Sequence, residues 1–279
     1  MGLVENLYDL FHVRARALKV AHLCAGLQYT AVVTDAGGTG IAYTNTEGGG
    51  CCPKGEGYRD YEGESAAELL ALIKSPVPLE RSMALALINA INHEAAGKMP
   101  EEPRDSGWMD SLGIGEKSRV AMVGLFGPLM KPLQERGALV EVIERNVRHS
   151  QTADFGSPRI FSGGEKSLFY DRLAEWAEVL VLTSTSILNG TAEEVLSNIG
   201  PEVKAILLGP STPMAPEAFA GLPVRMLGGT VVEDGEAVLR AVRHGAGTPV
   251  IHRFSRKVLM TVRPDGVGPD RQALRTERV

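Results

Sequence analysis

The stretch RVAMVGLFGPLMKPLQERGALVEVIE, residues 119–144, decides the fold class of this chain. It opens with an apolar run over Val120–Phe126, continues through a helical segment over Gly127–Arg136, and closes with a second apolar run over Leu139–Glu144. Continuous rather than alternating apolar residues predict strands that are buried on both faces. A helix between two such strands predicts a right-handed parallel crossover, the repeating unit of α/β proteins.

The same alternation of short apolar runs and helical segments continues toward the C-terminus. It predicts an α/β fold with a Rossmann-like parallel sheet, whose ligand lies at the carboxyl ends of the strands. The further predicted strands are Val179–Thr183, Lys204–Leu208 and Val224–Leu227, and the further helices are Ser167–Ala177, Thr191–Ile199, Ala215–Ala220 and Gly235–His244.

The N-terminal part of the chain has a different pattern, typical of a small α+β domain. A helix over residues 3–18 precedes three short runs that are separated by glycine-containing turns, which predicts an antiparallel meander. Two helices follow, with start signals at Ser65 and Pro78. The predicted strands are Leu18–Leu23, Thr30–Thr34 and Gly40–Thr44, and the helices are Ser65–Ile73 and Leu79–Ala95.

Proline, glycine and charged residues concentrate between Gly97 and Gly115, which indicates a surface linker. We therefore expect an α+β domain over residues 1–106 and a Rossmann-like domain over residues 107–264. Residues 265–279 are polar and aperiodic, and we expect them to form a loose tail.

Composition narrows the class of protein. The 279 residues include 29 basic and 34 acidic side chains, with no basic cluster, which argues against a nucleic-acid partner. Apolar runs are too short to cross a membrane, and the N-terminus has no signal-peptide pattern. The three cysteines, Cys24, Cys51 and Cys52, form a poor disulfide framework and are expected to be free thiols. A cytoplasmic location is expected, and assembly into a homo-oligomer is left open.

The turn after the first predicted Rossmann strand contains Gly124 and Gly127, and the next strand ends at Glu144, 20 residues beyond Gly124. In dinucleotide-binding folds an acidic residue at that place binds a ribose diol. However, the pattern is not G-x-G-x-x-G, and Pro128 lacks an N–H for a pyrophosphate. The alternative is structural: the glycines permit close packing, and Glu144 is a solvated strand end.

Two polar turns follow the next two strands and predict a ligand-binding rim. The first spans Thr183–Thr191 and the second spans Gly209–Pro213. Helix capping is the alternative role for several of their residues. The candidate ligand-binding residues in these turns are Ser184, Thr185, Asn189, Thr191, Pro210, Ser211 and Thr212.

In the first domain, the sequence Thr46–Pro53 joins a carboxylate, three glycines and two thiols. Thiolates bind soft metals, so Cys51 and Cys52 are candidate metal ligands, although two adjacent cysteines do not readily share one metal. His93 is expected to be a surface side chain. G-x-S-x-G, Walker A and H-E-x-x-H motifs are absent, so whether the chain is an enzyme stays open.

Several of these segments together resemble the DUF364 family with its DUF4213 N-terminal partner, the heavy-metal chelation proteins. The resemblance covers the chain up to about Pro264. It is carried by Glu47–Cys51, Leu85–Ala90, Gly124–Pro128, Val142–Glu144, Thr183–Thr191 and Leu208–Pro213.

The resemblance implies an N-terminal domain like that of enolase, a Rossmann-like C-terminal domain and a site between them. It adds Glu47, Gly49, Gly50 and Asn89 to the candidate ligand-binding residues.

Three functions are compatible with these observations. The first is handling of a small molecule or a metal chelate between the domains, with a role in heavy-metal chelation. The second is an enzyme acting on a nucleoside-like or pterin-like ligand. The third is a regulatory protein that senses a metabolite. The expected ligand is accordingly a transition metal or a nucleoside-like small molecule.

Overall fold

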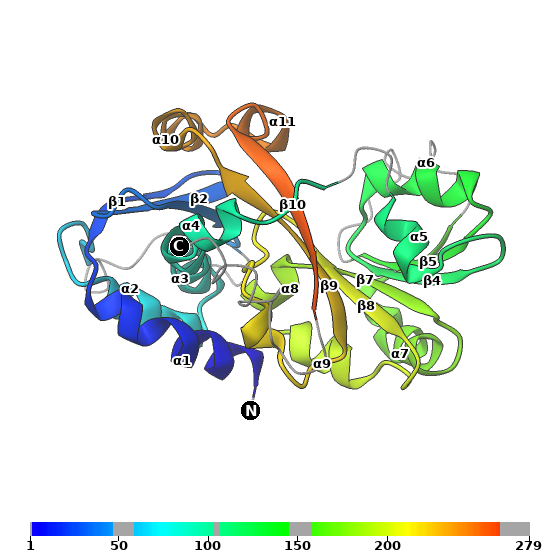
Figure 1. Cartoon of the computed structure of the whole chain (residues 1–279). Helices are drawn as coiled ribbons and strands as arrows, with labels where there is room; N and C mark the ends of the chain where they lie inside the picture. Colours follow the sequence, from blue (N-terminus) through cyan, green and yellow to red (C-terminus); the bar gives the residue numbers. More distant parts are fainter. Residues whose placement is uncertain (1, 47–58, 103–106, 145–157, 263–279) are drawn as a thin grey trace, which may run out of the picture.

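A computed structural model describes residues 2–46, 59–102, 107–144 and 158–262 of the chain (Figure 1). It contains a seven-stranded sheet and a separate three-stranded sheet. The larger sheet has the order β10-β9-β8-β7-β4-β5-β6, in which β10 is antiparallel to β9 and the other pairs are parallel. Its strands are β4 (Arg119–Val123), β5 (Leu139–Ile143), β6 (Arg159–Phe161), β7 (Val179–Thr183), β8 (Lys204–Leu208), β9 (Val224–Val232) and β10 (Ser255–Thr261).

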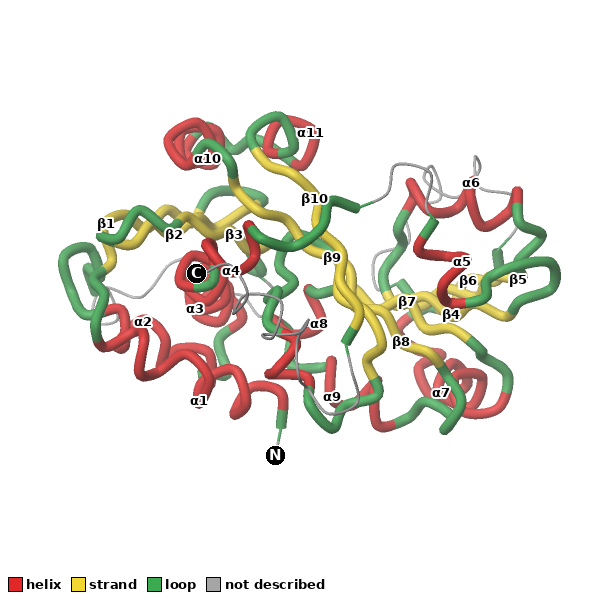
Figure 2. The backbone as a smooth tube through the Cα atoms, viewed as in Figure 1, coloured by secondary structure: helices red, strands yellow, loops and turns green. Residues whose placement is uncertain are grey.

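Both faces of this sheet are covered, which explains the continuous apolar runs of its strands. Val120, Ala121 and Met122, consecutive residues of β4, are each fully buried. One face packs against α5 (Trp108–Leu112) and α6 (Gly127–Glu135), and the other packs against α7 (Lys166–Glu175) (Figure 2). The fold is therefore the expected α/β architecture, and its strand order reverses between β4 and β7. The remaining helices of this half are α8 (Thr185–Leu188), α9 (Ala192–Ser197), α10 (Gly235–Arg243) and α11 (Thr248–Ile251), with 3-10 turns at Gly163–Glu165 and Pro216–Phe219.

The N-terminal half contains the predicted antiparallel meander in the order β1-β2-β3. The sheet packs against α3 so closely that a Cβ at Gly40 would collide with the backbone of Ala90. Ser65 caps α2 by accepting a hydrogen bond from the N–H of Ala67, and Pro78 lies in the first turn of α3. The elements are α1 (Leu3–Arg16), β1 (Val20–Ala25), β2 (Tyr29–Thr34), β3 (Thr39–Tyr43), α2 (Ala66–Ala71), a 3-10 turn at Leu72–Lys74, α3 (Pro78–Ile91) and α4 (His93–Gly97).

The outer face of the meander is covered by the C-terminal half of the chain. Tyr29 and Ile41 share an apolar cluster with Val238 and Val242 of α10 and Ile251 of α11. Figure 1 shows α10 above β1 and β2, while α3 lies beneath the same strands. The meander is thus the middle layer of a three-layer arrangement. We propose a domain boundary near residue 106 of the sequence. Apolar residues from both sides of this boundary pack into one core.

The prediction of a surface linker between Gly97 and Gly115 was wrong for residues 108–114, several of which are buried. Trp108, Met109 and Leu112 of α5 are each at most 4% exposed and pack against the large sheet. Glu101 forms an antiparallel bridge with Val258 of β10, so the segment also borders the edge of the sheet. The dense proline and glycine residues concealed a short apolar helix.

Other differences concern short elements. The strands β6 and β10 and the helix α8 were not predicted, β9 extends to Val232, and the predicted helix at Ala215–Ala220 is a 3-10 turn. The predicted tail, residues 265–279, lies outside the described residues. None of the described helices has the length and apolar character that crossing a bilayer requires.

The shared core predicts that a substitution in the C-terminal half destabilises both halves. Ile251 is fully buried against the meander, so Ile251→Ala is expected to lower the free energy of unfolding by about 2–5 kcal/mol. Denaturant unfolding followed by circular dichroism should retain one transition. Val13→Ala, at a helix position that is 66% exposed, is the control and should change stability by at most about 0.5 kcal/mol. Two separate transitions in the Ile251 variant would contradict a shared core.

Candidate functional site

A cleft of about 1050 Å³ opens where the strand order of the large sheet reverses. This volume is at the upper end of the range for small-molecule sites, and the position is the usual one for ligands in open α/β sheets. Both halves of the chain contribute to its walls. The lining residues are Gln28, Tyr29, Tyr43–Thr46, Val123–Phe126, Ile143, Glu144, Lys166, Tyr170, Thr183, Thr185, Ser186, Asn189, Thr191, Val195 and Thr248.

The wall from the N-terminal half consists of the start of β2 and the residues at the end of β3. Tyr29 bridges the two halves, because its hydroxyl lies 2.7 Å from the Oγ1 atom of Thr248. Burial raises the pKa of Tyr29 above its ordinary value, so the phenol stays protonated at neutral pH. The Tyr43 ring meets the Tyr29 ring edge to face, with the centroids 6.4 Å apart, and is itself 42% exposed. Tyr43 is therefore an aromatic surface that a ligand can contact.

The glycine turn after β4 forms part of the opposite wall. Gly124 has φ +83°, and a Cβ there would lie 3.0 Å from Cγ2 of Thr183, so the turn requires glycine. Glu144, which follows β5, lines the cleft. Its Oε2 atom accepts a hydrogen bond of 2.9 Å from the N–H of Leu125. The carboxylate thus holds the turn, a role that the sequence did not indicate. Gly127 begins α6 and is not among the lining residues.

The polar turn after β7 borders the cleft, and Thr191, the N-cap residue of α9, makes no side-chain capping bond. Thr185, Asn189 and Thr191 line the cleft. The Oδ1 atom of Asn189 accepts hydrogen bonds from the Oγ1 and N–H of Thr191, at 2.7 and 3.2 Å. These bonds fix the turn before α9, so the same side chains organise the backbone and face the ligand space. Ser184 is 1% exposed and lies outside the lining.

The turn after β8 joins the two halves. Ser211 is fully buried, and its Oγ accepts a hydrogen bond of 2.7 Å from the N–H of Tyr43 at the end of β3. Asn92 donates from Nδ2 to the carbonyl oxygen of Met214 at 2.6 Å. Thr212 is buried, and its Oγ1 has no hydrogen-bond partner among the described residues. The structure does not bring Pro210, Ser211 or Thr212 into the lining of the cleft.

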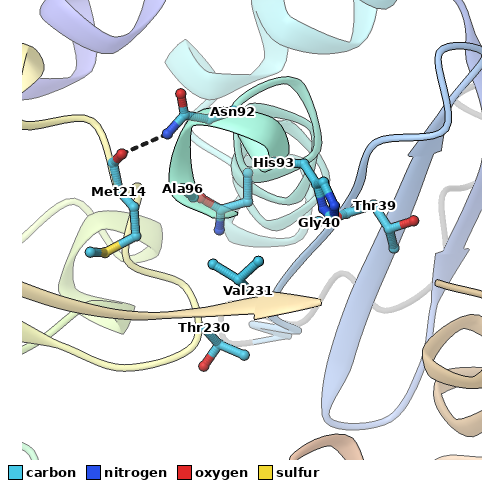
Figure 3. A pocket seen from close by; sticks show the side chains of 9 residues that line it. Thr39, Gly40, Asn92, His93, Ala96, Met214, Thr230 and Val231 are labelled. Carbon is cyan, nitrogen blue, oxygen red and sulfur yellow. Dashed lines mark hydrogen bonds between the residues drawn. The ribbon is translucent and has the colours of Figure 1, made fainter. Parts of the chain in front are cut away.

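A second, much smaller cavity of about 10 Å³ lies between the halves (Figure 3). Asn89 borders it and donates from Nδ2 to the carbonyl oxygen of Ile41 at 2.9 Å. His93, expected at the surface, is only partly exposed there and contacts the carbonyl oxygen of Thr39 at 3.0 Å. This space holds one water molecule at most. Asn89 is not among the lining residues of the large cleft, and the small cavity cannot hold an organic ligand.

The sequence analysis missed several cleft residues, among them Tyr29, Tyr43, Lys166 and Tyr170. Lys166 and Tyr170 lie at the start of α7, and Lys166 Nζ is 5.3 Å from the centre of the Tyr170 ring. The ammonium also forms an ion pair of 2.7 Å with Glu194, which raises the pKa of Lys166 above its usual value. No motif marks this segment. Only its position before a predicted strand of the sheet could have indicated that it borders the site.

The proposed metal ligands cannot be placed by the structure. Glu47, Gly49, Gly50, Cys51 and Cys52 lie outside the described residues, although Thr46, directly before them, lines the cleft. The described ranges contain no group of three or more His, Cys, Asp or Glu side chains that could hold a metal ion. Cys24 of β1 is a free thiol, as expected, and burial raises its pKa.

The contact between Ser211 and Tyr43 generates a test of its structural role. Ser211→Ala leaves the N–H of Tyr43 without its acceptor, so the free energy of unfolding is expected to fall by about 1–3 kcal/mol. Denaturant unfolding measures this change. Ser197→Ala is the control, because the Ser197 hydroxyl bonds to an exposed carbonyl within its own helix, that of Glu194. Equal stability of the two variants would show that Ser211 does not hold the halves together.

Solved structures resemble this fold across most of the chain. One is a protein of unknown function from the DUF364 family of Pyrococcus horikoshii, with a TM-score of 0.74 and 22% identity. It matches 94% of this chain and 100% of that one. Another DUF364 protein of unknown function, from Desulfitobacterium hafniense, has a TM-score of 0.70 and 17% identity, with 92% and 98% covered. At these identities the likeness establishes the fold.

Sequence comparison gives the family. An uncharacterized protein from Methanocaldococcus jannaschii is 25% identical over 270 residues, which are 92% of this chain and 96% of the relative. Residues 8–92 match the DUF4213 family and residues 107–261 match the DUF364 family, both described as "Putative heavy-metal chelation". The second match alone spans more than half of the chain. The chain is therefore a member of the DUF364 family and carries the DUF4213 region before it.

Proposed function

We propose that this protein binds a small polar molecule or a metal chelate in the cleft between its halves, and that this binding has a role in heavy-metal chelation. The observation that carries the proposal is the cleft itself, about 1050 Å³ in volume and lined by both halves. Such a space accommodates an organic molecule of some tens of atoms. A bare ion would need only a compact group of ligands, and the described residues contain none.

The chemistry of the lining supports a polar organic ligand. The walls present hydroxyl groups of Thr185 and Tyr43, the carboxamide of Asn189 and aromatic surface, an arrangement typical of sites that bind polar molecules. Among the described lining residues the charged side chains are Glu144 and Lys166, and Lys166 is already paired with Glu194.

The segment that follows Thr46 supplies the soft-metal chemistry in this proposal. We propose Cys51 and Cys52 as thiolate ligands, with Glu47, Gly49 and Gly50 beside them. Soft metals bind thiolates in preference to the hydroxyl and amide oxygens of the cleft walls. In this arrangement the walls hold the organic part of the chelate, and the thiolates contact its metal.

The proposal predicts that the purified protein retains a ligand. Native mass spectrometry with elemental analysis should find a small molecule, or such a molecule with a transition metal. Tyr43→Ala and Thr185→Ala remove one contact from each wall, and each should weaken binding of the identified ligand about tenfold, roughly 1.4 kcal/mol. Val13→Ala, on the exposed face of α1, is the matched control. If either wall can be altered without loss of affinity, the site does not lie between the halves.

A second candidate is an enzyme that acts on a nucleoside-like ligand, and the position of Glu144 favours it. This carboxylate lies in the cleft at the end of the strand that neighbours β4, where Rossmann-like proteins bind a ribose diol. The prediction is that adenosine binds, and that Glu144→Ala weakens its binding by about 1.5–3 kcal/mol. Isothermal titration calorimetry measures both affinities. Unchanged affinity in the variant would exclude a ribose contact at Glu144.

A further inference from the structure

The main-chain donors of the turn after β4 bear on the chemical class of the cleft ligand, and this inference rests on the proposed function. In dinucleotide-binding folds, the N–H groups of this turn and of the following helix hold the phosphates of the ligand. The number of donors still available in the turn therefore indicates whether a phosphorylated ligand fits.

In this chain three successive donors of the turn are already used by acceptors of the protein itself. The acceptors are the carbonyl of the neighbouring strand, a carboxylate and a thioether. The N–H groups of Gly124, Leu125 and Phe126 donate to Ile143 O at 3.0 Å, Glu144 Oε2 at 2.9 Å and Met122 Sδ at 3.3 Å, respectively.

The first residues of α6 add little to this supply. Pro128 has no N–H, and the N–H of Leu129 donates to the carbonyl oxygen of Phe126 at 2.9 Å. Gly127 is then the one main-chain donor from Gly124 to Leu129 for which the described part of the chain provides no acceptor. A phosphate group presents several acceptor oxygens and negative charge, which a single N–H does not satisfy.

The charge of the turn also disfavours a phosphorylated ligand. The Glu144 carboxylate occupies the place beside the Leu125 amide where a phosphate oxygen would bind, so an incoming anion would meet a like charge. Lys166, the cation of the described lining, already forms an ion pair of 2.7 Å with Glu194. The side chain of Glu144 therefore acts as a built-in substitute for a ligand anion.

We infer that Glu144 determines specificity by excluding phosphate from this turn. The cleft takes polar ligands that are not phosphorylated at that position, such as molecules with hydroxyl, amine or amide groups. A nucleoside meets this condition, whereas a dinucleotide does not. Within the proposed function, the organic part of the chelate is accordingly one without a phosphate.

Binding of inorganic pyrophosphate tests this inference without any need to know the natural ligand. Isothermal titration calorimetry is performed on the wild-type chain and on Glu144→Ala and Glu144→Gln. Removing the carboxylate frees the N–H of Leu125 and removes the negative charge that would repel pyrophosphate. The alanine variant should therefore bind pyrophosphate about 10- to 100-fold more tightly than wild type. The glutamine variant keeps an acceptor oxygen for Leu125 but loses the charge, so its gain should be smaller.

Glu202→Gln, at an exposed site outside the cleft, is the charge-matched control and should bind pyrophosphate as wild type does. Thermal melts establish that each variant is folded, and the glutamine variant serves if alanine at position 144 unfolds the chain. Equal affinity of wild type and both Glu144 variants would overturn the inference, whether that affinity is high or immeasurably low. This readout is separate from the retained ligand, so loss of the proposed function would leave its result standing.

Discussion

The packing of α10 and α11 against the three-stranded meander is the constraint on which the rest of the molecule depends. A sheet of three short strands has two faces, and α3 covers only one of them. The second face is buried by Val238, Val242 and Ile251 of α10 and α11, the helices that connect β9 to β10 of the large sheet. This contact fixes the position of β3 relative to β7 and β8. The cleft therefore has two walls whose separation is set by apolar packing outside the site.

Hydrogen bonds between the two halves determine their relative orientation more closely than the apolar contact alone. Ser211 accepts from the backbone of Tyr43, and Asn92 donates to the backbone of Met214, so each half anchors a main-chain group of the other. Such bonds are geometrically strict because a buried backbone group that loses its partner pays a desolvation cost. They place the end of β3, and with it Tyr43, in the wall of the cleft. The same residues that join the halves thus set the outline of the ligand space.

The sequence predicted those parts of the structure that depend on local pattern. The buried strands β4, β7 and β8 follow from continuous runs of apolar residues, and the cap at Ser65 follows from its hydroxyl. The role of Ser211 could not be predicted, because a hydroxyl in a turn after a strand serves equally well for capping, ligand contact or domain contact. The bond from Leu125 to Glu144 was hidden for a similar reason: the spacing located the carboxylate, but only the fold shows which donor reaches it.

The covering of the meander also bears on how the chain is made. Tyr29 and Ile41 leave the ribosome some two hundred residues before Ile251, which at typical synthesis rates corresponds to roughly 10–40 s. During that interval the outer apolar face of β2 and β3 has no native cover, because α10 and α11 do not yet exist. The nascent chain therefore exposes an apolar, aggregation-prone sheet face for most of its translation. Production of this protein at high level is accordingly expected to depend on chaperones that bind nascent apolar segments, more than for a chain whose first domain is complete in itself.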